Sequence, residues 1–307
     1  MKTPVSTSVD DQASATPVAR RIAVGINGYS EGLDAAALAA AISRATGATM
    51  MLIAVHPNPM IVVPEGLDWA SLHQQARNTL IESRDAFATD ARLVVRTDHS
   101  VARALHRVVR DEHRDLLVVG SSRHAAAGHV RIGKRTRQLL CHFECALAIA
   151  PRGLHELGDV RFKRIGVGYD GSPEAHAALA WARSVAVGCG ADLCVRGVVD
   201  DRMPTVGWGD VWTGGIMRDW IAVVDEEKDS LRHEAQATAE QAGLHVDAEA
   251  VSGRPADALL ELSAEVDLMV IGSRRWGPAK RVLLGSTGEA LTHDAACAVV
   301  AVPRPQA

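Results

Sequence analysis

The chain is poor in aromatic residues, lacks long apolar runs and has no large excess of either charge. Of its 307 residues, 4% are aromatic and 47% are hydrophobic, and the formal net charge is -4. No stretch approaches the ~18 consecutive apolar residues that a membrane helix needs. Residues 1–19 are polar and rich in Ser and Thr, without the apolar core of a secretion signal. These absences predict a cytoplasmic protein that begins with a flexible tail.

Cysteines are few and show no pairing pattern. There are five, without a Cys-x-x-Cys pair, which favours a reducing compartment over a disulfide framework. Cys141, His142 and Cys145 lie close together in "CHFEC", as the ligands of a metal site would. However, Cys145 and Cys297 each precede a short apolar run, "ALAIA" or "AVVAV". We therefore interpret both as core residues and predict no metal site.

The length suits two domains, and the same unit occurs twice along the chain. The segment "RRIAVGINGYSEGLDAAALAAA" from Arg20 matches "FKRIGVGYDGSPEAHAALAWA" from Phe162, which pairs Asn27 with Asp170. Further on, "DLLVVGSS" in the first half matches "DLMVIGSR" in the second. We expect a tail over 1–19, domains over 20–151 and 162–307, and a linker over 152–161.

Within each half, short β-rich apolar runs alternate with longer helical stretches, which is typical of βαβ units around a parallel sheet. Ser30 and Ser172 stand where helix N-caps belong, and Pro255 suits a first helical turn. The longest helix is expected at about 218–242, ended by Gly243. The predicted strands are 21–26, 49–55, 92–96, 116–119, 146–150, 164–168, 192–198, 246–251, 268–271 and 298–302. Each half is thus predicted to be a doubly wound α/β domain with a five-stranded parallel sheet.

In each half, one glycine-flanked loop follows the fourth predicted strand. In "GSRRWGPAKRVLLGST" the outer glycines, Gly272 and Gly285, are thirteen residues apart, as are Gly120 and Gly133 in the first half. Ligands of an open parallel sheet bind beyond the carboxyl ends of its strands, where these loops lie. The two loops are therefore candidate ligand sites.

The loop of the second half has the chemistry of a phosphate cradle. Ser286 and Thr287 begin a predicted helix, whose unpaired amides and dipole favour an anion. The loop also carries the cations Arg274, Arg275, Lys280 and Arg281. The alternative is a solvated basic loop that only caps the helix.

These segments resemble the universal stress protein family in a tandem arrangement. The resemblance rests on "DGS" at Asp170 and on a loop of the form Gly, two residues, Gly, nine residues, Gly, then Ser or Thr. It covers nearly the whole chain after residue 20, but Arg275 replaces the middle glycine. It implies a Rossmann-like fold of the adenine nucleotide alpha hydrolase type, with strand order 3-2-1-4-5 and pairing of the two fifth strands.

The resemblance also implies bound ATP, often with Mg²⁺. Asp170, with Gly171, would lie on the adenosine side and Val198 against the adenine ring. The phosphates would be held by Gly272, Gly285, Ser286 and Thr287. Arg275 would either block the triphosphate or grip it.

The first half departs further from the family pattern. Asn27 replaces the Asp, Arg123 the middle glycine, and Lys134 the Ser after Gly133. Asn27 lacks the charge of Asp170, whereas Lys134 still attracts phosphate as a point charge. Nucleotide binding is therefore expected mainly in the second half, with Asn27, Gly120, Gly133 and Lys134 as weaker candidates.

Four other patterns suggest competing functions. "GYSEG" matches a hydrolase nucleophile elbow, but Ser30 is better interpreted as a helix cap. "GHVRIGK" matches part of a phosphate loop but lacks the following Ser or Thr. An arginine-rich helix could contact nucleic acid, which the overall acidity disfavours. A tryptophan group could form a lid or a partner surface. The residues concerned are Arg103, Arg107, Arg110 and Arg114, and Trp69, Trp208, Trp212 and Trp220.

The sequence thus predicts a tandem stress-response protein that binds ATP or a related adenine nucleotide and has a regulatory or protective role through an unidentified protein partner. No catalytic residue can be assigned, so we expect a binding module rather than an efficient enzyme. A ligand-free scaffold and a slow nucleotide hydrolase remain as alternatives, and a homodimer stays open.

Overall fold

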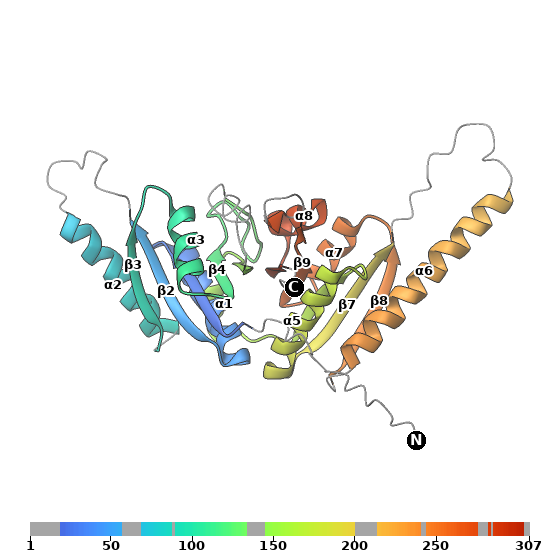
Figure 1. Ribbon diagram of the computed structural model, residues 1–307, viewed down its shortest axis with the longest axis horizontal. Coiled ribbons are helices and arrows are strands. Elements are labelled where there is room, and N and C mark those ends of the chain that lie inside the picture. Colours follow the sequence, from blue (N-terminus) through green and yellow to red (C-terminus); the bar gives the residue numbers. More distant parts are fainter. Residues whose placement is uncertain are drawn as a thin grey trace, which may run out of the picture.

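The structure, a computed structural model, describes residues 19–56, 69–87, 90–133, 145–199, 214–240, 244–275, 282–283 and 285–303. Strands and helices alternate in both halves of the chain (Figure 1). All ten predicted strands form, each with its ends within one residue of the prediction. The first half comprises β1 (Arg21–Ile26), α1 (Ser30–Thr46), β2 (Thr49–His56), α2 (Trp69–Phe87), β3 (Arg92–Thr97), α3 (Val101–Asp111), β4 (Leu116–Gly120) and β5 (Ala146–Ala150).

The second half repeats this order after a short 3-10 helix, η1 (Leu154–Leu157). It comprises β6 (Arg164–Tyr169), α5 (Pro173–Cys189), β7 (Asp192–Val199), α6 (Gly214–Glu240), β8 (Val246–Ser252), α7 (Pro255–Ser263), β9 (Leu268–Gly272), α8 (Ser286–Asp294) and β12 (Ala298–Val302). The strands β10 (Arg274–Arg275) and β11 (Val282–Leu283) form a separate two-stranded sheet. None of the helices in these ranges has the length and apolar character to cross a membrane.

The ten long strands form one sheet, in the order β3-β2-β1-β4-β5-β12-β9-β6-β7-β8. Each half has the expected order 3-2-1-4-5, with parallel pairing throughout. The halves meet through antiparallel pairing of β5 with β12, in which Ala148 lies opposite Val300. The predicted fold class and the predicted pairing of the fifth strands are confirmed.

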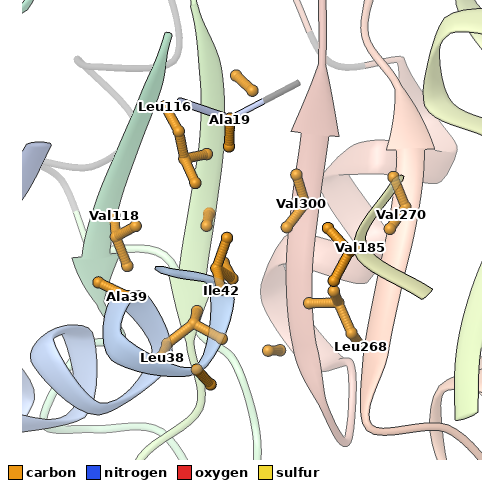
Figure 2. Close-up of a cluster of buried hydrophobic side chains, with 14 of the residues drawn as sticks. Ala19, Leu38, Ala39, Ile42, Leu116, Val118, Val185, Leu268, Val270 and Val300 are labelled. Atoms are coloured by element: carbon orange, nitrogen blue, oxygen red, sulfur yellow. The ribbon is translucent and has the colours of Figure 1, made fainter. Parts of the chain in front are cut away.

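Apolar side chains cover both faces of this sheet in two clusters. One cluster lies under α1, α2, α5 and α6, and the other lies under α3, α7 and α8. Figure 2 shows side chains of the first cluster at the junction of the halves, where both contribute. They come from α1 (Leu38, Ala39, Ile42), β4 (Leu116, Val118), α5 (Val185), β9 (Leu268, Val270) and β12 (Val300). The two halves therefore share a continuous core.

Four of the predicted helix starts lie in the described residues, and the cap predicted at Ser30 was wrong. Ser172 caps α5, since its hydroxyl accepts a hydrogen bond from the Ala175 amide at 3.1 Å, and Pro255 opens α7, as predicted. Ser30 is not an N-cap, because α1 begins at Ser30 and the cap is Tyr29. The amide of Tyr29 donates to the Asn27 side chain at 3.1 Å, as the Ser172 amide does to Asp170, so Tyr29 and not Ser30 is the counterpart of Ser172. The longest helix begins at Gly214, four residues before the prediction, and Gly243 lies outside the described residues.

The segment predicted as a linker is anchored by a buried carboxylate. Asp34 on α1 has no exposed surface. Its oxygens accept hydrogen bonds from the backbone amides of Gly153 and His155, both at 3.0 Å, and lie beside the His155 ring. Because a buried charge requires such partners, Asp34 fixes the path of the chain between the halves.

A close crossing of α1 and α5 joins the two halves on the helical layer. At Gly188 of α5, a Cβ atom would lie 1.6 Å from the carbonyl oxygen of Ala45 on α1. No real Cβ tolerates that distance, so glycine is required for the helices to approach.

We expect Gly188→Ala to force α1 and α5 apart. Overpacking of this kind lowers the free energy of unfolding by about 1–3 kcal/mol, which denaturant unfolding would measure. The control is Val187→Ala, at a neighbouring side chain that is 56% exposed, with an expected change below about 0.5 kcal/mol. Equal stability of the two variants would contradict the proposed steric role of Gly188.

Candidate ligand-binding site

A cavity of about 630 Å³ lies at the carboxyl ends of the strands in the second half. In an open parallel sheet this is where a ligand site is expected. Its walls come from the ends of β6, β7 and β9 and from the first residues of α5, α7 and α8. The lining residues are Gly168, Tyr169, Asp170, Ser172, Glu174, Ala175, Arg196, Val198, Arg254, Pro255, Ala256, Leu259, Ile271, Gly272, Gly285, Ser286, Thr287, Gly288 and Ala290.

Most residues predicted for the second half meet in this cavity. They are Asp170, Val198, Gly272, Gly285, Ser286 and Thr287. Gly171 is not part of the lining but forms the adjoining turn, with a φ of 68° that favours glycine. Arg275 lies in β10, and its side chain is outside the described part of the chain, as are Lys280 and Arg281.

Three helices begin at the cavity wall, which gives it the partial positive charge of helix N-termini. Ser286 and Thr287 form the first turn of α8, and its N-cap, Gly285, makes no side-chain cap bond. Ser172 caps α5, whereas the N-cap of α7 is Arg254. The start of α8 is thus able to bind an anion through backbone amides and hydroxyls.

Gly272 has a packing role that the sequence did not reveal. A Cβ atom at Gly272 would lie 2.7 Å from the backbone of Glu174, and one at Gly120 would lie 1.9 Å from the carbonyl oxygen of Glu31. In both halves the fourth strand therefore ends in glycine because the first helix of that half approaches its backbone. The recurrence of these glycines reflects the fold as well as any ligand.

The turn after the first strand is built alike in both halves. The Asp170 carboxylate accepts a hydrogen bond from the Ser172 amide at 3.1 Å, just as the Asn27 side chain does from Tyr29. Gly28 has a φ of 76°, close to that of Gly171. The exchange of Asp for Asn therefore keeps the turn and removes only a negative charge.

Arg196 is a cavity residue that the sequence analysis missed. Its Nη2 lies 2.9 Å from Oε2 of Glu249 on the neighbouring strand, and its side chain is 15% exposed. The register pairs Arg196 with Glu249, whereas the same step of the first half pairs Ile53 with Val94, both buried. The sequence offered one sign of this residue, an arginine within the otherwise apolar strand "DLCVRGVV". Its partner, Glu249, could be identified only from the strand register.

The glycine loop of the first half does not border the described cavity. It forms hydrogen bonds with the second half of the same chain. The amides of Val130 and Ile132 donate to the carbonyls of Ala295 and Thr292, at the C-terminal end of α8, at 2.8 and 3.0 Å. Gly133 lies beside Ser122, and Lys134 is outside the described residues.

The basic face of α3 is matched by acidic side chains. Arg103 and Arg107 lie 2.5 and 3.8 Å from Asp98. The hydrogen bond from Arg103 lowers the pKa of Asp98 to about 2, so this carboxylate stays charged near neutral pH. Arg110 pairs with Asp111, and Arg114 with Glu112. This pairing reduces the positive charge available to nucleic acid.

The remaining predicted features are only partly described. Within the described ranges no group of three or more His, Cys, Asp or Glu side chains could hold a metal ion. Cys145 and Cys297 are buried, as expected for core residues, and burial raises the pKa of the Cys297 thiol to about 12. Cys141, His142 and the tryptophan side chains of the predicted lid lie outside the described part.

Comparison with known proteins identifies the repeated unit. The model of the universal stress protein family matches residues 19–151 and again residues 161–303. Universal stress protein Rv1996 of Mycobacterium tuberculosis is 24% identical over 313 residues, covering 93% of this chain and 95% of that protein. Rv2005c of the same organism is 26% identical over 230 residues, covering 74% and 75%.

A solved structure has the same architecture. A universal stress protein from Archaeoglobus fulgidus superposes with a TM-score of 0.62 at 16% identity, covering 94% of this chain and 99% of that chain. At this identity the likeness shows the fold alone.

Proposed function

Because the chain belongs to the universal stress protein family and carries its domain twice, we propose that its second half binds ATP or a related adenine nucleotide. In this proposal the protein is a regulatory or protective module of the stress response, and the nucleotide changes its affinity for a protein partner. The observation that carries the proposal is the cavity at the strand ends, which joins Asp170, Val198, Gly272 and the first turn of α8.

The start of α8 suits the phosphate end of a nucleotide. Its first amides have no partners within the helix, and the hydroxyls of Ser286 and Thr287 line the same wall. Gly285 brings no side chain into the space that a phosphate would occupy. An anion at this position gains hydrogen bonds together with the favourable helix dipole.

The part of the wall at the ends of β6 and β7 suits the nucleoside. Val198 offers an apolar surface to a base, and the Asp170 carboxylate can accept hydrogen bonds from ribose hydroxyls. The cavity volume, about 630 Å³, falls within the range of ~300–1,000 Å³ that is usual for small-molecule sites. Mg²⁺, which prefers oxygen ligands, would enter with ATP, bound by its phosphate oxygens.

A ligand-free scaffold is the second candidate function. Two observations favour it. The sheet of ten strands is continuous through both halves, and the first-half glycine loop forms hydrogen bonds with backbone carbonyls of α8 and its C-cap. Under this alternative, the amides at the start of α8 only face solvent. A measurement of nucleotide binding distinguishes this scaffold from the proposed nucleotide-binding module.

The direct test is thermal unfolding of the purified protein with ATP, ADP and adenosine, each with Mg²⁺ and with a chelator. A ligand at a hundredfold excess over its Kd stabilises the folded state by ~2.7 kcal/mol, so ATP is expected to raise the melting temperature by several degrees. Mass spectrometry of gently purified protein should also detect retained nucleotide. A melting temperature unmoved by millimolar ATP and Mg²⁺ would favour the scaffold.

Gly285→Asp tests the phosphate end without harming α8. The φ of -69° and ψ of 175° at Gly285 suit any residue, and Asp is a favourable N-cap. The added carboxylate should weaken ATP binding at least about tenfold, or ~1.4 kcal/mol, by repelling phosphate, and should leave adenosine binding unchanged. The control is Gly285→Asn, which adds the same bulk without the charge and should therefore weaken ATP binding less than the Asp variant does. Equal ATP affinity of the Asp and Asn variants would argue against phosphate at α8.

The double change Arg196→Ile with Glu249→Val tests the nucleoside end. The two new side chains are those of the equivalent pair in the first half, Ile53 and Val94. The fold tolerates that pair there, so the double variant should fold. Removal of a charged donor from the base end should weaken ATP and adenosine equally, by about tenfold or ~1.4 kcal/mol. Calorimetric titration of both ligands measures this. A loss confined to ATP would instead assign Arg196 to the phosphates and reverse the proposed ligand orientation.

A further inference from the structure

The helix α8 touches the cavity at one end and the first half of the chain at the other. Its first residues, Gly285 to Gly288, line the cavity. At its last turn, the carbonyl of Thr292 accepts the Ile132 amide at 3.0 Å, and the carbonyl of Ala295 accepts the Val130 amide at 2.8 Å. The last carbonyls of a helix lack partners within the helix, so the first-half loop supplies them.

Apolar packing reinforces these hydrogen bonds. Val130 has no exposed surface, and Ile132 packs against the same buried cluster, which includes Leu291 and Ala295. Figure 1 shows the loop that follows β4 beside α8, across the junction of the two halves. The loop therefore holds α8 through both backbone and side-chain contacts.

The loop itself is braced by the first half. The hydroxyl of Ser121 accepts the Arg131 amide at 2.6 Å, which ties the far side of the loop to the end of β4. The Gly128 amide donates to the Arg152 carbonyl at 2.8 Å, and the Arg152 amide donates back to the His129 carbonyl at 3.1 Å. These bonds fix the loop to the segments that follow β4 and β5, so α8 is anchored to the core of the first half.

We propose that the first-half loop, residues 120–133, is a positioning element of the second-half ligand site, with the Val130 and Ile132 amides as the groups that hold α8. This inference rests on the proposed nucleotide function. In this proposal α8, which is nine residues long, moves as a unit, so a ligand bound at its start stabilises the docking of the loop at its end. Linkage is reciprocal: docking of the loop must raise ligand affinity by the same factor.

The proposal assigns different tasks to the two glycine loops. In the first half, the amides at 130 and 132 are used by carbonyls of α8, so they are not offered to a phosphate. Arg123 and His124 of the same loop are exposed on the surface of the first half.

The test combines a variant pair with hydrogen exchange. Proline has no amide hydrogen, so Ile132→Pro removes the bond to Thr292, whereas Ile132→Ala keeps it. We expect Ile132→Pro to weaken ATP binding about tenfold and Ile132→Ala to stay within about threefold. In the wild-type protein, saturating ATP should slow exchange of the Val130 and Ile132 amides at least several-fold, while the Leu52 amide in the core of the first half stays unchanged.

The outcomes separate the two proposals. Wild-type protein that binds no nucleotide would overturn both the proposed function and the coupling. Wild-type protein that binds ATP with unchanged exchange at Val130 and Ile132 would overturn the coupling alone. The exchange measurement needs no variant, so it decides the matter even where Ile132→Pro does not fold. Equal ATP affinity in the folded Pro and Ala variants would also overturn it.

Discussion

The antiparallel pairing of β5 with β12 is the contact on which the rest of the architecture depends. Both strands are completely buried, and Ala148 opposite Val300 joins two parallel sheets into one. This single pairing sets the position of one half against the other, because neighbouring strands allow little freedom of register. It brings α8 within hydrogen-bond distance of the first-half loop and α1 against α5. The contacts between the halves are thus consequences of one strand pair.

The two halves keep the same fold but differ where a ligand would bind. The turn at Gly28 and Gly171 is retained, and so is the glycine that ends the fourth strand. In contrast, the apolar pair of Ile53 with Val94 becomes Arg196 with Glu249. Positions required by backbone geometry therefore repeat, whereas the cavity position Arg196 and its partner Glu249 do not. This difference is what the proposed function requires, in which the second half binds the ligand and the first half positions α8.

Local patterns predicted the strands well, because apolar runs bounded by turn residues depend on neighbours in sequence. The position of Ser30 was missed, since the turn closed by Asn27 makes Tyr29, and not Ser30, the residue that caps α1. Arg196 and the partners of Val130 were beyond sequence reasoning for another reason: they depend on register and on contacts between distant segments. Of the six predicted residues in the cavity lining, Gly272, Gly285, Ser286 and Thr287 were suggested by the glycine-flanked loop and the helix after it, and Asp170 and Val198 by the family resemblance. Whether they bind a nucleotide remains a prediction.

The charges around the cavity favour one ligand orientation, independently of any family. Asp170 and Glu174 place two carboxylates near the start of α5, which opposes an anion there despite the helix dipole. The carboxylate in the first turn of α8, Glu289, is not among the cavity-lining residues, and the N-cap of this helix is a glycine. A ligand with an anionic tail and a hydroxyl-bearing body is therefore expected to direct the tail toward α8 and the hydroxyls toward Asp170. Because α8 is held by the first half, the wall that would receive the anion is also the wall that contacts the other domain.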